Sequence, residues 1–210
     1  MKGMKMGIKQ QEKTVQTKQE MKKAAKELFL QKGYDATSIQ DIADKAAYSV
    51  GSYYRQWKSK QQIFMEIWDE FVSGFIRTSV MEAPEHMDPE IMITYLLDRS
   101  KQFQEDPMSV KLSLTSHVLS ATYEYDQMST WFPKYKNMLY LFLKEASHSE
   151  NEQKLMSTAN IIHCILNADA MKNTPIIVPR YEFDYATLYE CIWALVENCK
   201  QDPAVQEKRQ

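Results

Sequence analysis

Apolar residues recur every three or four positions along most of the chain, the spacing that places them on one face of an α-helix. The pattern predicts about nine helices. They cover residues 14–32, 39–46, 49–57, 59–81, 89–104, 107–123, 129–147, 151–172 and 184–200. The 210 residues include only five glycines and seven prolines, too few for the many tight turns of a sheet protein. We therefore predict an all-α fold.

Polar residues at the expected helix ends support these boundaries. Gly33 follows the first helix, where a left-handed residue commonly ends a helix. Two segments, 37–40 and 59–62, match a capping box, in which two side chains satisfy free backbone N–H groups at a helix start. Single capping residues precede four other helices: Ser49, Asp88, Asp106 and Asp184.

Charge divides the chain into two unlike parts. Residues 1–60 hold thirteen basic and six acidic residues, a net charge of +7, whereas the remaining 150 residues hold 13 basic and 22 acidic residues, a net charge of −9. A basic head on an acidic body indicates that the head binds a polyanion and that the body has another role.

The cysteines and the apolar stretches exclude several classes of protein. Cys164, Cys191 and Cys199 are an odd number without paired spacing, which predicts neither a disulfide framework nor a metal site. Reduced thiols are typical of a cytoplasmic protein. No window is long and apolar enough to span a membrane. We expect no cofactor, no membrane association and a cytoplasmic location.

Residues 21–64 predict a helix-turn-helix: a helix, a sharp connection, a short helix, a three-residue turn and a second short helix. Several residues in it stand at a recognisable spacing: Ala24-Ala25, Leu28-Phe29, Gly33-Tyr34, Thr37-Ser38-Ile39, Ile42-Ala43, Ala46, Ser49, Gly51, Tyr54, Lys60 and Ile63-Phe64. With them, the first third of the chain closely resembles the DNA-binding domain of the tetracycline-repressor-like (TetR) transcription regulators. The rest agrees with that family only in length, helix count and aromatic-rich composition.

The resemblance implies a role for each short helix. Residues 39–46 are similar to the positioning helix and residues 49–57 to the recognition helix, with Tyr53 and Trp57 facing the core. Tyr54 matches a tyrosine that touches phosphate. The residues expected at the DNA are Thr37, Ser38, Gln40, Ser49, Val50, Ser52, Tyr54, Lys58 and Lys60. Gln40, Val50 and Ser52 are the candidates for base edges, although Gln40 has the alternative role of closing the capping box.

The turn departs from the family pattern. Ala46-Ala47-Tyr48-Ser49 stands where the family commonly has Ala-Gly-Val-Ser. A left-handed backbone at Ala47 would cost roughly 1 kcal/mol relative to glycine. Tyr48 is expected either to stack inward or to project toward a phosphate.

The body carries a candidate effector site. Polar groups fall on apolar helix faces, and the resemblance implies a ligand cavity lined by Trp68, Phe71, Phe75, Met92, Arg99, Phe103 and His117. Burying an unpaired guanidinium costs free energy, so we consider three situations in which Arg99 avoids that cost. It reaches water, pairs with an acid such as Asp98 or Glu105, or meets an anionic ligand.

The last helix carries two apolar stripes, of which one monomer core needs only one. We therefore expect a two-fold homodimer through the last two helices. Its interface is expected to contain Leu155, Ile162, Leu166, Leu188, Ile192 and Leu195.

Together these features predict four segments: a flexible basic arm over residues 1–13, a helix-turn-helix DNA-binding domain over 14–58, a helical ligand-binding and dimerisation domain over 59–200, and a frayed tail over 201–210. The function indicated is a DNA-binding transcriptional regulator, a repressor released from a palindromic operator by a small apolar or amphipathic effector. The alternative is a helix-turn-helix protein whose body binds a protein partner. No catalytic motif suggests an enzyme.

Overall fold

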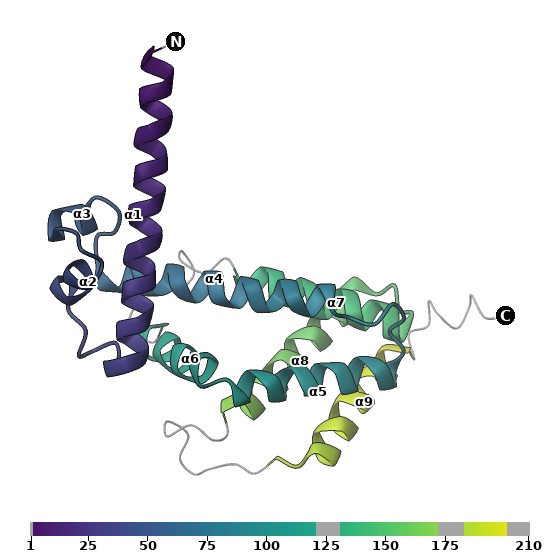
Figure 1. Ribbon diagram of the computed structural model, residues 1–210. Coiled ribbons are helices and arrows are strands. Elements are labelled where there is room, and N and C mark those ends of the chain that lie inside the picture. The colour runs from purple at the N-terminus through teal and green to yellow at the C-terminus, as the bar shows by residue number, and fades with distance from the viewer. Residues whose placement is uncertain (1, 121–130, 172–182, 201–210) are drawn as a thin grey trace. The chain divides into compact units, whose positions relative to one another are not determined.

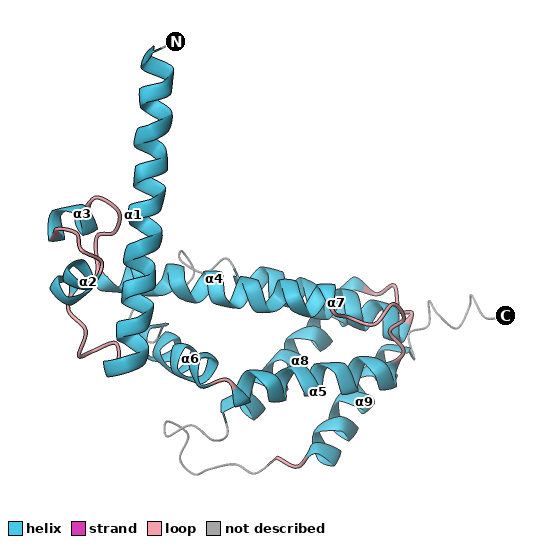
Figure 2. Cartoon of the chain, viewed as in Figure 1, coloured by secondary structure: helices cyan, strands magenta, loops and turns pink. Residues whose placement is uncertain are grey.

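The computed structural model describes residues 2–120, 131–171 and 183–200, and these are helical apart from short loops (Figures 1 and 2). Within the described residues there are nine helices and no strand, as the hydrophobic pattern predicted. The helices are α1 (Lys2–Lys32), α2 (Ile39–Lys45), α3 (Val50–Tyr54), α4 (Lys60–Met81), α5 (Pro89–Glu105), α6 (Pro107–Ser120), α7 (Trp131–Ser147), α8 (Glu152–Met171) and α9 (Tyr185–Lys200).

Two predicted boundaries were wrong. α1 begins at Lys2 rather than at residue 14, so the arm expected over residues 1–13 is part of a helix. Lysine, methionine, glutamine and glutamate are good helix formers, and extending an existing helix costs far less than starting one. α3 ends at Tyr54 rather than at Trp57, although N–H groups of the next residues still bond to Tyr53 O. The predicted tail over residues 201–210 lies outside the described residues.

The capping signals explain most of the other boundaries. Asp88 accepts a 2.8 Å hydrogen bond from Ile91 N–H at the start of α5, and Asp184 accepts a 2.9 Å bond from Thr187 N–H at the start of α9. Gly33 has a φ of 89°, the left-handed conformation expected after α1. No helix in the described part of the chain is long and apolar enough to cross a membrane.

The chain forms two compact units. Unit 1 comprises residues 1–70 and 115–128, and unit 2 comprises residues 71–114 and 129–210, so α4 and α6 contribute to both. The core of unit 1 is made of buried side chains from α1 to α4: Met21, Ala25, Phe29, Ile42, Ala43, Tyr53, Trp57, Ile63 and Phe64. Its aromatic centre joins Phe29, Tyr34 and Phe64, whose ring centroids lie 5.4 to 5.7 Å apart.

In unit 2, the helices α5, α7, α8 and α9 pack against one another. Their buried side chains form a second core that includes Met92, Ile93, Leu139, Leu143, Leu155, Ile162 and Ile192.

Candidate nucleic-acid interface

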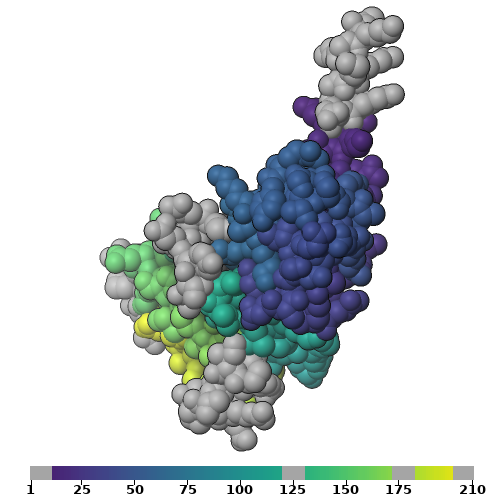
Figure 3. All heavy atoms as spheres, turned by 90° about the vertical axis from the view of Figure 1, so that its left-hand side faces the viewer, coloured from purple at the N-terminus to yellow at the C-terminus, as the bar shows by residue number. Residues whose placement is uncertain are grey.

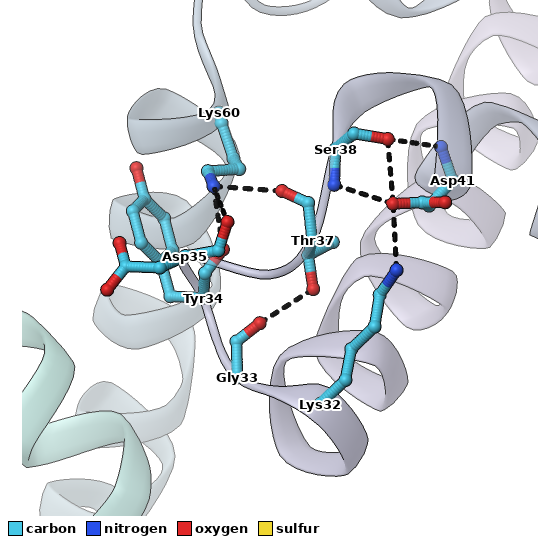
Figure 4. Close-up of polar contacts among 8 residues, drawn as sticks. All are labelled: Lys32, Gly33, Tyr34, Asp35, Thr37, Ser38, Asp41 and Lys60. Atoms are coloured by element: carbon cyan, nitrogen blue, oxygen red, sulfur yellow. Dashed lines mark hydrogen bonds and ion pairs between the residues drawn. The ribbon is translucent and has the colours of Figure 1, made fainter.

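The loop between α1 and α2 is held by a chain of short polar contacts (Figure 4). Ser38 is the N-cap of α2, and its hydroxyl accepts a 3.0 Å hydrogen bond from Asp41 N–H. The Asp41 carboxylate in turn accepts a 2.7 Å bond from Ser38 N–H. The capping box was predicted one residue too early, because Ser38 rather than Thr37 has the extended backbone of a cap. Thr37 is buried instead and donates to Gly33 O at 2.7 Å.

Asp41 also binds Lys32 of α1, with 2.8 Å between Nζ and Oδ2. The bonds from Lys32 and then Ser38 hold the pKa of the Asp41 carboxyl well below its usual range. With Asp41 in the box, Gln40 is not the capping residue. Its amide donates to Asp44 at 2.7 Å on the exposed side of α2.

Lys60, the first residue of α4, reaches back to the same loop (Figure 4). Its ammonium donates to Tyr34 O at 2.6 Å and to Thr37 O at 2.8 Å, and it lies 4.2 Å from the centre of the Tyr34 ring. Burial lowers the pKa of the Lys60 ammonium, and Asp35 opposes that shift. The cation thus joins two chain segments of unit 1, the loop between α1 and α2 and the start of α4.

The turn between α2 and α3 has the strained, left-handed backbone that was considered for it. Ala47 has a φ of 58°, in the left-handed region that favours glycine. Tyr48 N–H bonds to Ala43 O at 2.9 Å, and the Tyr48 hydroxyl donates to the Glu20 carboxylate of α1. That hydrogen bond lowers the pKa of Glu20. Tyr48 therefore links the turn to α1, a contact that neither predicted role included.

One side of α3 packs on the core of unit 1, and the other side is exposed. Tyr53 is fully buried, its ring lies 5.3 Å from that of Trp57, and its hydroxyl donates to Ser59 O at 2.9 Å. Burial raises the pKa of this phenol well above its usual value. Trp57 donates to Glu66 of α4 at 2.7 Å. Both residues face the core, as predicted, whereas Tyr54 between them is 54% exposed.

Ser49 and Ser52 stabilise the first turn of α3. The Ser49 hydroxyl accepts from Ser52 N–H at 3.2 Å, as expected of an N-cap. Ser52 is buried and accepts a 2.6 Å bond from Arg55. Arg55 is exposed beside Tyr54 and was not among the predicted DNA-binding residues, although a basic residue just after a recognition helix was a usable signal.

The nine predicted DNA-binding residues thus fall into two groups within unit 1. Six have side chains at least partly exposed around α2 and α3: Ser38, Gln40, Ser49, Val50, Tyr54 and Lys58. Three are engaged inside the unit: Thr37, Ser52 and Lys60. Figure 3 looks onto the face where the dark blue atoms of α2 and α3 lie at the surface.

Four of the predicted effector-site residues lie together in unit 2. The Phe103 ring is 6.2 Å from Phe71 and 5.4 Å from Phe75, and the Arg99 guanidinium lies 4.7 Å from the centre of the Phe75 ring. Met92 is fully buried in α5 of the same unit. Trp68, which is buried, and His117, which is exposed, belong to unit 1.

Arg99 has several partners of its own. Its guanidinium pairs with Glu82 at 3.2 Å and donates to Ser79 and Thr78 at 3.1 Å. A further bond of 2.8 Å goes to Gln102. The acid is therefore Glu82 rather than the expected Asp98 or Glu105, because those two stand on other sides of α5.

The expected dimer-interface side chains lie mostly in the core of the single chain. Five of them are at most 7% exposed: Leu155, Ile162, Leu166, Leu188 and Ile192. Only Leu195 is half-buried. The sequence showed two apolar stripes on the last helix but not which one faces the core. The prediction assigned the core-facing stripe to the dimer interface. The apolar residues that face outward on α8 and α9 are Ile161, Tyr185 and Trp193.

Residues 23–67 match the family model described as bacterial regulatory proteins of the TetR family. The HTH-type transcriptional regulator AcrR of Shigella flexneri is 30% identical over 117 residues, which are 56% of this chain and 46% of AcrR. The chain spans about half the length of this relative.

Solved structures share the fold over most of the chain. A TetR transcription regulator from Haloarcula marismortui aligns with a TM-score of 0.65 at 16% identity, covering 88% of this chain and 98% of its own. The multidrug binding protein EbrR, in a complex with ethidium, aligns with a TM-score of 0.59 at 17% identity, covering 85% and 97%.

Proposed function

The chain belongs to the TetR family of bacterial regulatory proteins, and from this premise we propose that it is a sequence-specific, DNA-binding transcriptional regulator. The observation that carries the proposal is the anchoring of α3. Tyr53 and Trp57 hold this helix to the core, while Ser49, Gly51 and Tyr54 are exposed and Val50 is partly exposed. A helix held in this way presents its free face to the major groove.

We assign the contacts by exposure. Gln40, which is exposed, and Val50, which is partly exposed, lie at the starts of α2 and α3 and read base edges, with Val50 suited to a thymine methyl. Tyr54 and Lys58 bind phosphate, and Ser38 and Ser49 approach the backbone. The engaged residues Thr37, Ser52 and Lys60 position these groups by their bonds inside unit 1.

The test begins with selection of bound sites from a randomised duplex pool by the purified full-length chain. Affinity for the selected duplex should fall steeply with salt, by about 0.9 log units per log unit of salt for each neutralised phosphate. Tyr54→Phe should weaken binding to all duplexes alike, whereas Val50→Ala should change which bases are preferred. Failure to enrich any sequence, or a Tyr54→Phe variant with altered sequence preference alone, would contradict the proposal.

We further propose that the regulator is a homodimeric repressor of a palindromic operator. A two-fold dimer places two copies of α3 one helical turn apart, which requires symmetric half-sites. Support comes from the large apolar side chains that face outward on α8 and α9, Ile161, Tyr185 and Trp193, because exposed apolar surface on neighbouring helices is typical of a protein–protein interface. The selected sequences should therefore contain an inverted repeat, and a single unrepeated half-site would oppose the dimer.

The effector proposed for unit 2 is a small apolar or amphipathic molecule. Its support is the group of aromatic rings around Arg99, and the related fold of EbrR holds ethidium. Such a ligand acts only if it binds better to the DNA-free conformation than to the bound one. An acid would compete with Glu82 for Arg99, so Arg99→Met should weaken operator release by long-chain acids more than release by neutral aromatics.

A second function remains for unit 2, which is docking of a protein partner. The exposed Ile161, Leu141 and Trp193 are the observation that favours it. Operator release by any small compound in the titration above supports the effector. A response only to a protein partner would replace that proposal while leaving the DNA-binding function intact.

A further inference from the structure

Glu66, in the part of α4 that belongs to unit 1, contacts both α1 and the segment that follows α3. One oxygen of its carboxylate, Oε1, pairs with two lysines of α1. Lys18 Nζ lies 2.7 Å from this oxygen and Lys22 Nζ lies 3.2 Å from it. The other oxygen, Oε2, accepts a 2.7 Å hydrogen bond from the indole N–H of Trp57. A single carboxylate therefore joins three elements of unit 1.

The bond between Trp57 and Glu66 is of a strong kind. Burial opposes ionisation of Glu66, but the hydrogen bonds from Lys18, Trp57 and Lys22 outweigh it and lower the pKa of the carboxyl. A hydrogen bond to an ionised acceptor is stronger than one between neutral groups. The indole N–H is a donor only, and the Trp57 side chain is 3% exposed, so the loss of this acceptor would be unfavourable. Glu66 therefore fixes the orientation of the Trp57 ring.

Trp57 is in turn bonded to α3 through its backbone and packed on it through its ring. Its backbone N–H donates to Tyr53 O at 3.0 Å, which continues the helical bonding past the end of α3. Its ring lies 5.3 Å from the buried ring of Tyr53. The exposed Tyr54 stands between these two anchored residues. A change in the orientation of Trp57 would therefore move the exposed face of α3 as well.

We propose that Glu66 is a positioning residue for sequence recognition: through its bond to Trp57 it sets the angle at which α3 enters the major groove. This inference rests on the proposed DNA-binding function. Contacts to base edges require groups that are held within about 0.5 Å of the productive geometry by the side chains behind them. Contacts to phosphate carry no sequence information. Loss of the bond should therefore reduce specificity more than it reduces binding to DNA in general.

The experiment measures a specificity ratio with the full chain. This ratio is the affinity for the selected duplex divided by the affinity for the same duplex with one base pair changed, the change that the wild type discriminates against most strongly. Trp57→Phe keeps a buried ring and removes the N–H donor, whereas Glu66→Met keeps the length of the side chain and removes the acceptor. Each should lower the ratio by about tenfold, the order of effect of one mismatched base pair. Affinity for an unrelated duplex should not fall.

Two combined variants identify the bond that matters. Trp57→Phe with Glu66→Met should lower the specificity ratio no further than either change alone, because both remove the same hydrogen bond. Lys18→Gln with Lys22→Gln removes the pairs on Oε1 and leaves the bond from the indole to Oε2 in place. This lysine variant should keep the wild-type ratio, even where its melting temperature is lower.

A further control separates positioning from stability. Ile63 of α4 is fully buried, and Ile63→Val removes a methyl group from the core of the same unit. It should lower the melting temperature and keep the specificity ratio. All binding is measured at a temperature at which circular dichroism shows every variant folded.

Three results would overturn the inference: unchanged ratios in Trp57→Phe and Glu66→Met, losses that multiply when the two are combined, or an equal loss in Ile63→Val or in the lysine variant. None of these would affect the proposed function, which fails only if the wild type selects no site at all.

Discussion

Polar side chains stabilise the two units at different ranges along the sequence. In unit 1, Ser38 and Asp41 satisfy each other's backbone N–H groups within three residues, and Ser49 caps α3 in the same way. In unit 2, the buried carboxylate of Asp169 on α8 accepts bonds of 3.2 Å from Ser100 and 2.6 Å from Gln104, both on α5. These partners are 69 and 65 residues away.

The difference has a consequence for stability. A cap is made as soon as its own helix forms, because all of its groups lie in one turn. Asp169 finds its partners only when α5 and α8 have packed, and its burial would be unfavourable without them. The caps of α2 and α3 therefore need only local contacts, whereas the Asp169 cluster in unit 2 depends on the correct pairing of α5 with α8.

The largest expected effect tests this dependence on α9. Ile192 is fully buried, and its neighbour Trp193 is 37% exposed. Ile192→Asp should lower the free energy of unfolding of unit 2 by more than about 4 kcal/mol, because a carboxylate enters the core unpaired. Trp193→Asp should change it by less than about 1 kcal/mol. Urea unfolding followed by circular dichroism measures both.

Sedimentation of the same pair examines the dimer. Trp193→Asp should shift the mass toward a single folded chain, since it places a charge on the outward face of α9. If the wild type already sediments as a single chain at micromolar concentration, the proposed dimer is excluded. If Trp193→Asp unfolds unit 2 as severely as Ile192→Asp, the assignment of the two faces is wrong.

The range of the contacts also explains how far the sequence predicts the structure. Gly33, Asp88 and Asp184 indicated helix ends correctly because a cap depends on nearby residues. The start of α1 was missed because its first half has no apolar stripe, although its residues favour a helix.

The contacts between helices could not be predicted from the sequence. Leu188 and Ile192 were assigned to a partner but lie in the chain's own core, because two apolar stripes of similar strength do not reveal which faces inward. Glu82 was not predicted as the partner of Arg99, from which it is separated by 17 residues and a loop. Lys60 was expected at the DNA, and its bonds to the loop carbonyls follow from the packing of α4 against α1.

Lys60 provides the next test, because its bonds to the loop carbonyls are among the long-range contacts of unit 1. Lys60→Met should destabilise unit 1 by about 2 kcal/mol, the order expected when hydrogen bonds to a charged donor are lost. Lys60→Arg should restore part of this, while the exposed Lys101→Met in unit 2 should have little effect. Thermal unfolding measures all three variants.

The salt dependence of DNA binding separates two roles for Lys60. If the ammonium only positions the loop, Lys60→Met lowers affinity and leaves the log–log salt slope unchanged. A slope reduced by about 0.9 would instead identify a direct phosphate contact.

A smaller effect is expected at the turn between α2 and α3. Ala47→Gly should stabilise unit 1 by up to about 1 kcal/mol, since glycine adopts a positive φ without the steric cost of a Cβ. The adjacent Ala46, with a φ of −83°, is the matched control. Ala46→Gly should destabilise by a similar amount, because glycine adds freedom to the unfolded chain. Destabilisation by Ala47→Gly would show that the turn is not strained in solution.

The smallest effect concerns the local charge at the start of α2 and depends on pH. The pKa of Asp41 is lowered in the folded chain by Lys32 and then Ser38, so its contribution to stability is present above the pKa of an unfolded aspartate, about 3.9. That contribution is lost as the pH falls through this value toward the folded pKa. Asp41→Asn should therefore lower the melting temperature at neutral pH, and the difference from the wild type should shrink below about pH 4. Both groups of the ion pair are exposed, so added salt should reduce the difference as well. Asp98, which is exposed in unit 2, provides the control variant Asp98→Asn for the loss of a carboxylate. An equal pH-dependent change in its melting temperature would show that the contacts of Asp41 contribute nothing specific to stability.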